Sequence, residues 1–211
     1  MRTLGTITDS LPNGTYPVRI FAGKKGLTTV QLDYLPIANY GYGGYYWQDT
    51  FWAGFNITVN GGSVTQNVTL ARTVSKIELQ ILDNIPTNAS TISMSIDPQF
   101  GSQSVLYGDL DSDYYTDSVQ YNVTIPISAK GKPNFTVDRI IAPSYPLTVK
   151  ITCKDAGNNI IATATASNVG TNANKKTILS GNLFGGPVGN SQNFQVKIDT
   201  AWNTTPINAS F

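Results

Sequence analysis

Residues 76–81 show the clearest alternation of polar and apolar side chains in the chain. Three polar residues alternate there with three aliphatic ones: Lys76, Ile77, Glu78, Leu79, Gln80 and Ile81. A period of two is typical of a β-strand with one buried face and one solvated face. The segment before it is aromatic-rich and dominated by loop residues, whereas regular alternation follows it. We therefore expect the organisation of the chain to change near Arg72.

Segments with this alternation recur along most of the chain, separated by turns rich in Gly, Asn and Pro. The predicted strands span residues 16–22, 28–32, 55–59, 64–70, 76–82, 91–96, 120–128, 134–140, 147–154, 160–167, 176–184 and 194–199. No window of helical length shows a 3.6-residue period. Many short strands between such turns indicate an all-β sandwich with little helix.

Two hairpins are predicted from residues that tolerate a positive φ. Residues 60–63 would connect the strands 55–59 and 64–70, and residues 155–159 would connect 147–154 and 160–167. In the strand 120–128, Pro126 lacks a backbone donor, which indicates an edge strand or a bulge, while Ile127 is expected to face inward.

The in-phase apolar positions of successive strands are expected to share one core. The predicted core residues are Ile77, Leu79, Ile81, Ile92, Met94, Ile96, Val123, Ile125, Val149, Ile151 and Cys153. Cys153 is the only cysteine, so no disulfide can form within the chain. Because free cysteine is among the most buried residue types, we interpret Cys153 as a small core residue rather than a nucleophile.

Residues 39–54 hold a run of aromatic side chains with glycines between them, which we interpret as a long excursion from the sheets. Planar rings on such a loop could stack on a glycan or anchor a protein partner. The candidate ligand-binding residues are Tyr45, Tyr46, Trp47 and Trp52. The alternative, which we favour, is that these rings and Phe51 close the end of a small core.

Composition excludes several classes of function. The net charge is +1 and no basic run is present, which argues against a nucleic-acid partner. Histidine is absent, so the commonest general base and metal ligand are missing. No pair of carboxylates is marked as facing each other, as glycoside hydrolysis would require. We therefore expect no enzymatic activity and no cofactor.

Residues 109–113 form the best candidate for a metal site, because Asp109, Asp111 and Asp113 occupy alternate positions as in a calcium loop. The rest of that motif fails. Tyr114 stands at the sixth position in place of glycine, and Gln120 at the twelfth in place of glutamate. We predict a solvated acidic loop and no bound metal.

The chain lacks the apolar run of about 20 residues that a transmembrane helix needs. Residues 1–10 also lack the apolar segment of a signal peptide. Yet the composition is rich in Thr, Ser, Asn, Gly and Tyr and poor in Lys and Glu. We interpret it as that of an exported bacterial surface protein whose targeting segment has been removed.

Three segments resemble the fimbrillin superfamily, the subunits of type V pili and their anchor and tip relatives. Residues 11–22 (LPNGTYPVRIFA) are similar to a strand near the end of the family's N-terminal domain. Residues 68–86 (VTLARTVSKIELQILDNIP) resemble its segment leading into the C-terminal domain, with Ser75 where alanine is usual. Residues 174–184 and 194–199, followed by Trp202, resemble its closing strands.

This resemblance implies two transthyretin-like β-sandwich domains, here residues 1–72 and 73–211, with the N-terminal one truncated. It also implies secretion as a lipoprotein, assembly into adhesive surface fimbriae at the outer membrane, and other fimbrial subunits as partners. The lipidated cysteine and part of the N-terminal domain that the family usually carries are missing here. The alternative function is a surface glycan-binding module that uses the aromatic loop, with a host protein or glycan as partner.

The segment 203–211 has a short strand pattern, with Ile207 and Phe211 on one face. Fimbrillin stalk subunits join by β-strand addition, in which a C-terminal strand of one subunit fills a groove in the next. The resemblance therefore implies that Ile207 and Phe211 fill pockets of a neighbouring subunit. The alternatives are a final edge strand of the chain's own sheet, or a frayed end.

Overall fold

The computed structural model describes the backbone of residues 7–23, 34–35, 38–41, 44–100, 103–104, 115–116, 118–143, 146–185, 194–199 and 207–210. Side chains are described for these residues except 34–46, 100, 103–104, 115–116, 199 and 207–210. The predicted strand 28–32 and Phe211 lie outside the described residues. So does the acidic loop around Asp111, of which only the backbone of 115–116 is described.

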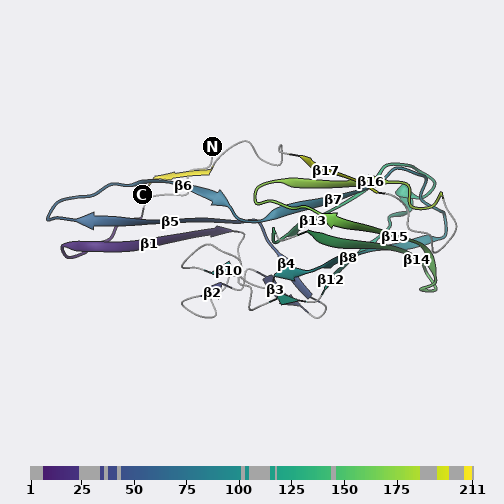
Figure 1. Cartoon of the computed structure of the whole chain (residues 1–211), viewed down its shortest axis with the longest axis horizontal. Helices are drawn as coiled ribbons and strands as arrows, with labels where there is room; N and C mark the ends of the chain where they lie inside the picture. Colours follow the sequence, from purple (N-terminus) through teal and green to yellow (C-terminus); the bar gives the residue numbers. More distant parts are fainter. Residues whose placement is uncertain are drawn as a thin grey trace.

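Two four-stranded sheets form a β-sandwich, as the alternation in the sequence predicts (Figure 1). One sheet has the order β13-β7-β16-β17, and the other has the order β12-β8-β14-β15. The strands of the first are β7 (Ser75–Ile81), β13 (Phe135–Ile141), β16 (Lys176–Gly181) and β17 (Gln195–Asp199). Those of the second are β8 (Ala89–Asp97), β12 (Val119–Thr124), β14 (Leu147–Asp155) and β15 (Ile160–Val169).

The core lies between these two sheets and confirms the predicted set of residues. Ile77, Leu79 and Ile81 are fully buried in β7, while the residues between them are only half-buried. All eleven predicted residues belong to one cluster, with Val123 packed against it as a partly buried member. Cys153 is fully buried, and burial raises the pKa of its thiol to about 11. An inert structural cysteine has this environment.

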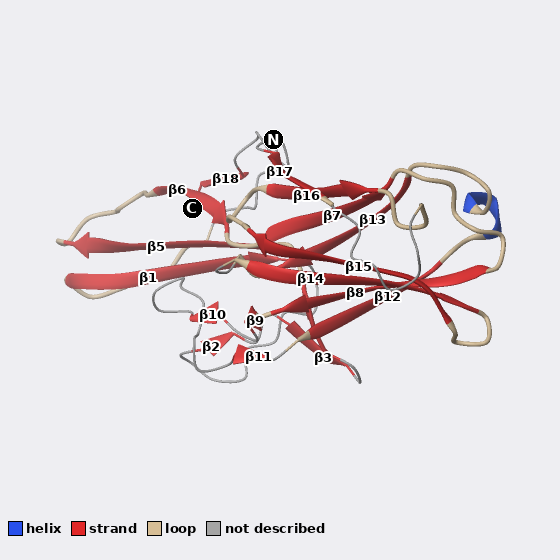
Figure 2. Cartoon of the chain, turned by 45° about the vertical axis from the view of Figure 1, so that its right-hand side comes forward, coloured by secondary structure: helices blue, strands red, loops and turns tan. Residues whose placement is uncertain are grey.

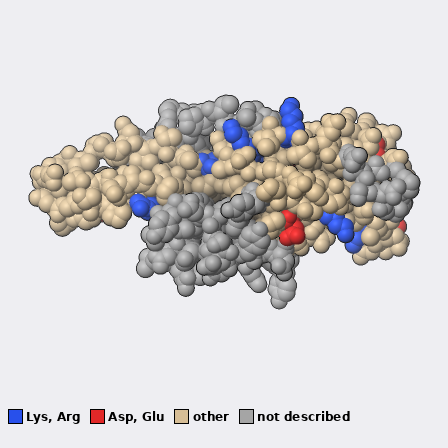
Figure 3. Space-filling model, in the orientation of Figure 1, with Lys and Arg blue, Asp and Glu red and all other residues tan. Residues whose placement is uncertain are grey.

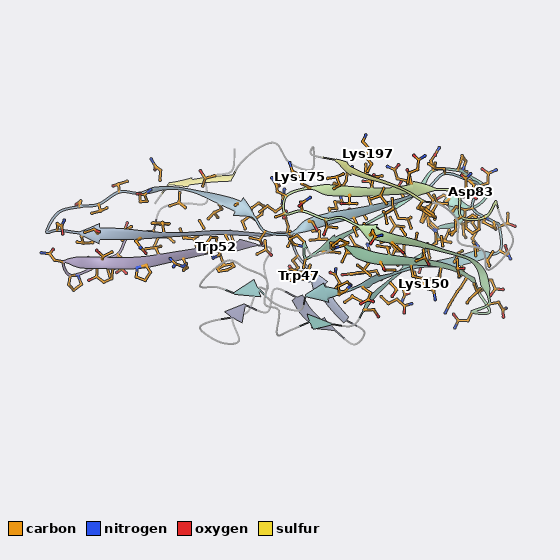
Figure 4. All side chains as sticks on the ribbon, in the orientation of Figure 1. Trp47, Trp52, Asp83, Lys150, Lys175 and Lys197 are labelled. Atoms are coloured by element: carbon orange, nitrogen blue, oxygen red, sulfur yellow. The ribbon has the colours of Figure 1, made fainter. Side chains whose placement is uncertain are left out.

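The strands β7 and β16 pair in parallel, whereas β7 and β13 are antiparallel. Ion pairs on the solvent face connect these three strands. Lys176 contacts Glu78 across the parallel pair at 3.2 Å, and Lys76 contacts Asp138 on β13. Figure 4 shows Lys175 and Lys197 on this side of the sandwich and Lys150 on the opposite side. Positive charge is therefore spread over the sandwich.

A separate sheet, which we call the N-terminal sheet, occupies one end of the elongated molecule, and the sandwich occupies the other (Figures 1 and 2). It has the order β1-β5-β6-β18 and consists of β1 (Gly14–Gly23), β5 (Thr50–Val59), β6 (Asn67–Arg72) and β18 (Ile207–Ser210). The division predicted between residues 72 and 73 falls between β6 and β7, which belong to different sheets. That the two parts are separate domains stays a prediction.

Three short two-stranded sheets complete the described structure. They pair β3 (Ala38–Gly41) with β4 (Gly44–Trp47), β2 (Tyr34–Leu35) with β10 (Gln103–Ser104), and β9 (Gln99–Phe100) with β11 (Tyr115–Thr116). The described residues include one short helix, the 3-10 helix η2 (Ile127–Ala129). Among the described residues, no helix has the length and apolarity needed to cross a membrane.

The hairpin predicted at residues 60–63 is confirmed in part, because β5 and β6 are antiparallel neighbours but pair only at the end far from the turn. β5 pairs with β1 over ten residues, from Gly23↔Thr50 to Gly14↔Val59, and with β6 only through Phe51↔Arg72 and Trp52↔Ala71. Gly61 does adopt the positive φ of a turn, at 80°. The turn signal identified the reversal of the chain correctly, while the long pairing of β5 with β1 lies on the other edge of β5. The hairpin predicted at residues 155–159 is confirmed, as β14 and β15 are paired.

Ile127 is also misplaced in the sequence-based prediction, because it was expected to face inward and is 87% exposed. The strand β12 ends at Thr124, and Pro126 leads into η2. Proline cannot donate to a ladder, so the period of two stops before Ile127. The edge position expected for this strand is confirmed, because β12 is the outer strand of its sheet.

Candidate functional site

The strand β18 places the candidate residue Ile207 on the N-terminal sheet. β18 pairs antiparallel with β6, with the registers Ile207↔Leu70, Asn208↔Thr69, Ala209↔Val68 and Ser210↔Asn67. On β6, Leu70 and Val68 are buried, while Thr69 and Asn67 between them are exposed. For the tail segment, we considered a strand that joins another subunit, a final edge strand of the chain's own sheet and a frayed end. The structure shows residues 207–210 as the final edge strand. Whether the same strand also joins another subunit stays a prediction.

β6 diverges from β5 beyond its two paired residues, and Figures 1 and 2 show β6 alongside the β1–β5 pair. The apolar side chains of β1 and β5 that share the face of Phe51 are half-buried. They are Tyr16, Val18, Ile20, Ala22, Ala53, Phe55, Ile57 and Val59. Leu70, at 2% exposed, is far better covered. The sheet therefore has one strand with a well-buried face, β6, which carries the tail, and a less covered apolar pair of strands beside it.

Arg72 lies where β6 meets both β5 and the sandwich, and it is 8% exposed. Its Nε donates to Asp49 Oδ1 at 2.6 Å and its Nη2 donates to Asp49 Oδ2 at 3.0 Å. Nη1 donates to Asn174 Oδ1 at 3.0 Å, and the guanidinium lies 4.8 Å from the ring centroid of Phe51. We call Arg72, Asp49, Phe51 and Asn174 the Arg72 cluster.

The Arg72 cluster joins three separate parts of the chain. Asp49 precedes β5, Phe51 belongs to β5, and Asn174 lies in the sandwich just before β16. Backbone bonds run alongside, since Thr73 N donates to Thr50 O at 2.9 Å and Asn174 N donates to Val74 O at 2.8 Å. A planar guanidinium with fixed partners defines one orientation. Both carboxylate oxygens of Asp49 accept hydrogen bonds from Arg72, so the cluster is arranged to hold β6 in one orientation.

The candidate aromatic residues differ in their surroundings. Trp47 is 5% exposed, and its strand β4 lies against β12 and β13 at the side of the sandwich (Figure 4). This burial leaves little of the ring available to a ligand. The backbone of Tyr45 and Tyr46 belongs to β4, but their side chains lie outside the described residues.

Trp52 is half-buried on the N-terminal sheet (Figure 4), and its ring lies close to Gly54. A Cβ at Gly54 would be 2.6 Å from two atoms of the Trp52 ring and 3.1 Å from Arg19 Cδ. The glycine expected to interrupt the strand therefore makes room for the ring within a regular strand, which corrects the view of residues 50–54 as an excursion. An aromatic ring that covers a strand glycine is a known stabilising arrangement.

Metal ligands do not gather in the described parts of the chain, where no group of three or more His, Cys, Asp and Glu residues could hold an ion. Asp155 is bonded to Asn159 within its turn, and these hydrogen bonds lower the pKa of the carboxyl group. Asp83 accepts hydrogen bonds from the backbone N–H groups of Leu183 and Phe184 at 3.0 and 2.6 Å. These two carboxylates have structural roles.

Comparison with known proteins identifies the family. The model of a family of unknown function, DUF6562, matches residues 28–209. The chain belongs to DUF6562. A search of curated proteins gives no match.

The fold of this DUF6562 chain is similar to that of a putative cell adhesion protein from Bacteroides ovatus ATCC 8483. The TM-score is 0.50 at 12% identity, with 92% of this chain and 72% of the other covered. Two further putative cell adhesion proteins, from Bacteroides uniformis ATCC 8492 and Bacteroides fragilis NCTC 9343, give TM-scores of 0.40 and 0.42 at 12% and 11% identity. The matches cover 74% and 89% of this chain but 60% and 66% of theirs. At these identities the similarity concerns the fold alone.

The Arg72 cluster is the part of this DUF6562 chain that the sequence analysis missed. One signal was present, because Arg72 is in phase with Val68 and Leu70 along β6 and so had to lie on a buried face. A buried arginine requires an acidic or carbonyl partner. Asp49 lies 23 residues away and Asn174 lies 102 residues away, so no local pattern indicates either partner.

Proposed function

We propose that this DUF6562 chain is a subunit or accessory protein of bacterial surface fimbriae, with a role in adhesion, and that copies associate by β-strand addition. The observation that carries the proposal is the pairing of β18 with β6. A strand from far along the chain returns to the N-terminal sheet and occupies its edge. In an assembly, the same strand would occupy the same edge of the next copy.

The exchange needs no new kind of contact. A strand that leaves its own β6 and pairs with the β6 of another copy forms the same main-chain bonds and the same register, so swapping costs little. Main-chain hydrogen bonds supply affinity, and alternate side chains supply the register. Ile207, opposite the buried Leu70, would be the residue that fixes this register. Phe211 would extend the same face.

Low charge on the N-terminal sheet supports close approach of another chain. Its four strands contain two charged residues, Arg19 and Arg72. In Figure 3 this end of the molecule shows hardly any charged atoms, compared with the sandwich. An extended strand therefore meets neither repulsion nor a large desolvation penalty there.

An adhesion-related role at the cell surface follows the names of the structural neighbours, which are putative cell adhesion proteins. The fold similarity to the protein from Bacteroides ovatus supports this proposal, and the fimbrillin-like segments of the sequence point in the same direction. Protease treatment of intact cells that express the chain tests the location. Loss of the chain without lysis supports surface exposure, whereas full protection contradicts it.

Disulfide trapping tests the strand exchange directly. Thr69 and Asn208 are opposite each other in the β6–β18 pair. Two single variants, Thr69→Cys and Asn208→Cys, are mixed and oxidised, so that a disulfide between positions 69 and 208 can join only different chains. Cys153 is fully buried in the native protein and does not compete. We expect a cross-linked dimer of one chain of each variant.

Matched variants separate a specific exchange from random collision. Ile207→Asp places a charge opposite the buried Leu70, whereas Asn208→Asp places the same charge opposite the exposed Thr69. Oligomers measured by light scattering should disappear in Ile207→Asp and after deletion of residues 203–211, and should persist in Asn208→Asp. Unchanged oligomers in Ile207→Asp and in the chain without residues 203–211 would exclude the tail as the joining strand.

A further inference from the structure

We propose that the Arg72 cluster is a positioning device that holds β6 in the orientation in which it accepts a tail strand. This inference rests on the proposed function, because it assigns a role to residues beside the accepting strand. The bonds described for the cluster join Arg72 to Asp49, Phe51 and Asn174, whereas β18 pairs with residues 67–70 of β6. It would therefore act through β6.

β6 is fastened to the rest of the N-terminal sheet at one end. Within the described strands, residues 67–70 pair with β18, and the pairing with β5 is confined to Ala71 and Arg72. The main-chain pairing between β6 and β5 is thus confined to one end of β6, while the buried Val68 and Leu70 hold the accepting part by side-chain packing. The direction of β6 at that end sets where the accepting edge lies.

Arg72 fixes that end of β6 from two sides. Its bidentate pair with Asp49 and its stacking on Phe51 fasten β6 to the start of β5. Its bond to Asn174 fastens the same side chain to the sandwich. Asn174 itself has a positive φ of 59° and donates its backbone N–H to Val74 O, so its side chain is presented from a fixed turn. One guanidinium thus relates β6 to both parts of the molecule.

The cluster is separate from the residues that hold the sandwich together. The hydrophobic core cluster contains residues of both sandwich sheets but no residue of β6 or β5. Loss of the Arg72 contacts should therefore loosen β6 and leave the sandwich intact. Local loosening of this kind is measurable by hydrogen exchange.

The first experiment measures hydrogen exchange on the full chain. Arg72→Lys keeps the charge but loses the planar fork, and Asp49→Asn keeps the shape but loses the charge. We expect amides of residues 67–72 to exchange about 10- to 100-fold faster in both variants, the range for loss of a charged hydrogen bond. Amides of β8 and β14 should be unchanged. The matched control is Lys176→Met, which removes the half-buried ion pair with Glu78 in the sandwich and should leave β6 unchanged.

The second experiment adds Arg72→Lys to both chains of the disulfide trap. The rate of cross-linking between chains should fall, while the melting temperature stays near that of Lys176→Met. A purely structural role would change the melting temperature and leave the cross-linking rate of the folded protein unaltered.

Four outcomes decide the matter. Unchanged exchange at residues 67–70 in both variants overturns the inference, as does an unchanged cross-linking rate. If Arg72→Lys unfolds the whole chain, Asn174→Ala, which removes one of the described bonds, is judged by the same exchange measurement. If the Thr69→Cys and Asn208→Cys chains that keep Arg72 never cross-link, the proposed function fails, and exchange at residues 67–72 still decides whether the cluster positions β6.

Discussion

Leu79 and Ile127 show how little residue type says about burial. Both are large aliphatic residues in or near a strand, yet one is fully buried and the other is 87% exposed. The difference arises from Pro126, which ends the ladder of β12 just before Ile127. The alternation rule holds only while the backbone remains in a strand, so a single proline reverses the environment expected for the next residue.

The two residues give a matched pair for stability. Leu79→Ala should lower the free energy of unfolding by about 2–5 kcal/mol, because a fully buried leucine leaves a cavity. Ile127→Ala should change it by less than about 0.5 kcal/mol, as expected for an exposed position. Urea unfolding followed by circular dichroism measures both. Equal losses would contradict the assignment of β7 to the core.

Cys153 gives a pH-dependent prediction. The pKa of its thiol is raised to about 11 from 9.0, so the folded state holds the proton more tightly than the unfolded state. The protonated Cys153 thiol therefore contributes its full stabilisation of the folded state below pH 9, and this contribution is lost as the pH rises toward 11. Between these values the melting temperature of the native protein should fall more steeply than that of Cys153→Ala. Parallel pH profiles would contradict it, as would rapid reaction of the native thiol with a disulfide reagent at pH 8.

At the scale of elements, the sequence predicts strands better than it predicts their partners. The hairpin β14–β15 was predicted because its turn and both arms are adjacent in the chain, and Asn158 adopts the positive φ that the turn requires. The pairing of β5 with β1 and the parallel pairing of β7 with β16 join distant segments, so no local signal specifies them. The same limit applies to Arg72, whose buried phase is visible in β6 but whose partners are not.

Gly54 provides a test of the element β5. Gly54→Ala should lower the free energy of unfolding by about 1–3 kcal/mol, because its Cβ would overlap the Trp52 ring. Gly62→Ala is the control, since a Cβ there meets nothing within 4 Å. Denaturant melts of the single variants and of Gly54→Ala combined with Trp52→Ala decide the cause. If the two losses simply add, the ring over Gly54 is not the source of the cost.

At the scale of the whole molecule, the N-terminal sheet and the sandwich differ in how completely their apolar residues are covered. The sandwich strands β7, β8 and β14 have fully buried side chains, whereas those of β1 are at most half-buried. Buried apolar area is the main source of stability. The two ends of the molecule are therefore expected to open at different free energies.

Native-state hydrogen exchange in low concentrations of urea measures that difference. Amides of β1 and β5 should exchange through openings of lower free energy than amides of β8 and β14. Within each pair of strands, β1 with β5 and β8 with β14, the opening free energies of the two strands should agree, and this agreement is the internal control. A single opening free energy for all four strands would mean that the chain unfolds as one cooperative unit.

The return of β18 to β6 also bears on the order in which the molecule is completed. Leu70 emerges from the ribosome long before Ile207, because synthesis proceeds from the N-terminus. Until the later segment arrives, the edge of β6 that it will cover has no partner from its own chain. Contacts between segments so far apart in sequence form slowly. The part of the molecule made first is thus the part finished last, and during that interval its edge is open to any other strand nearby.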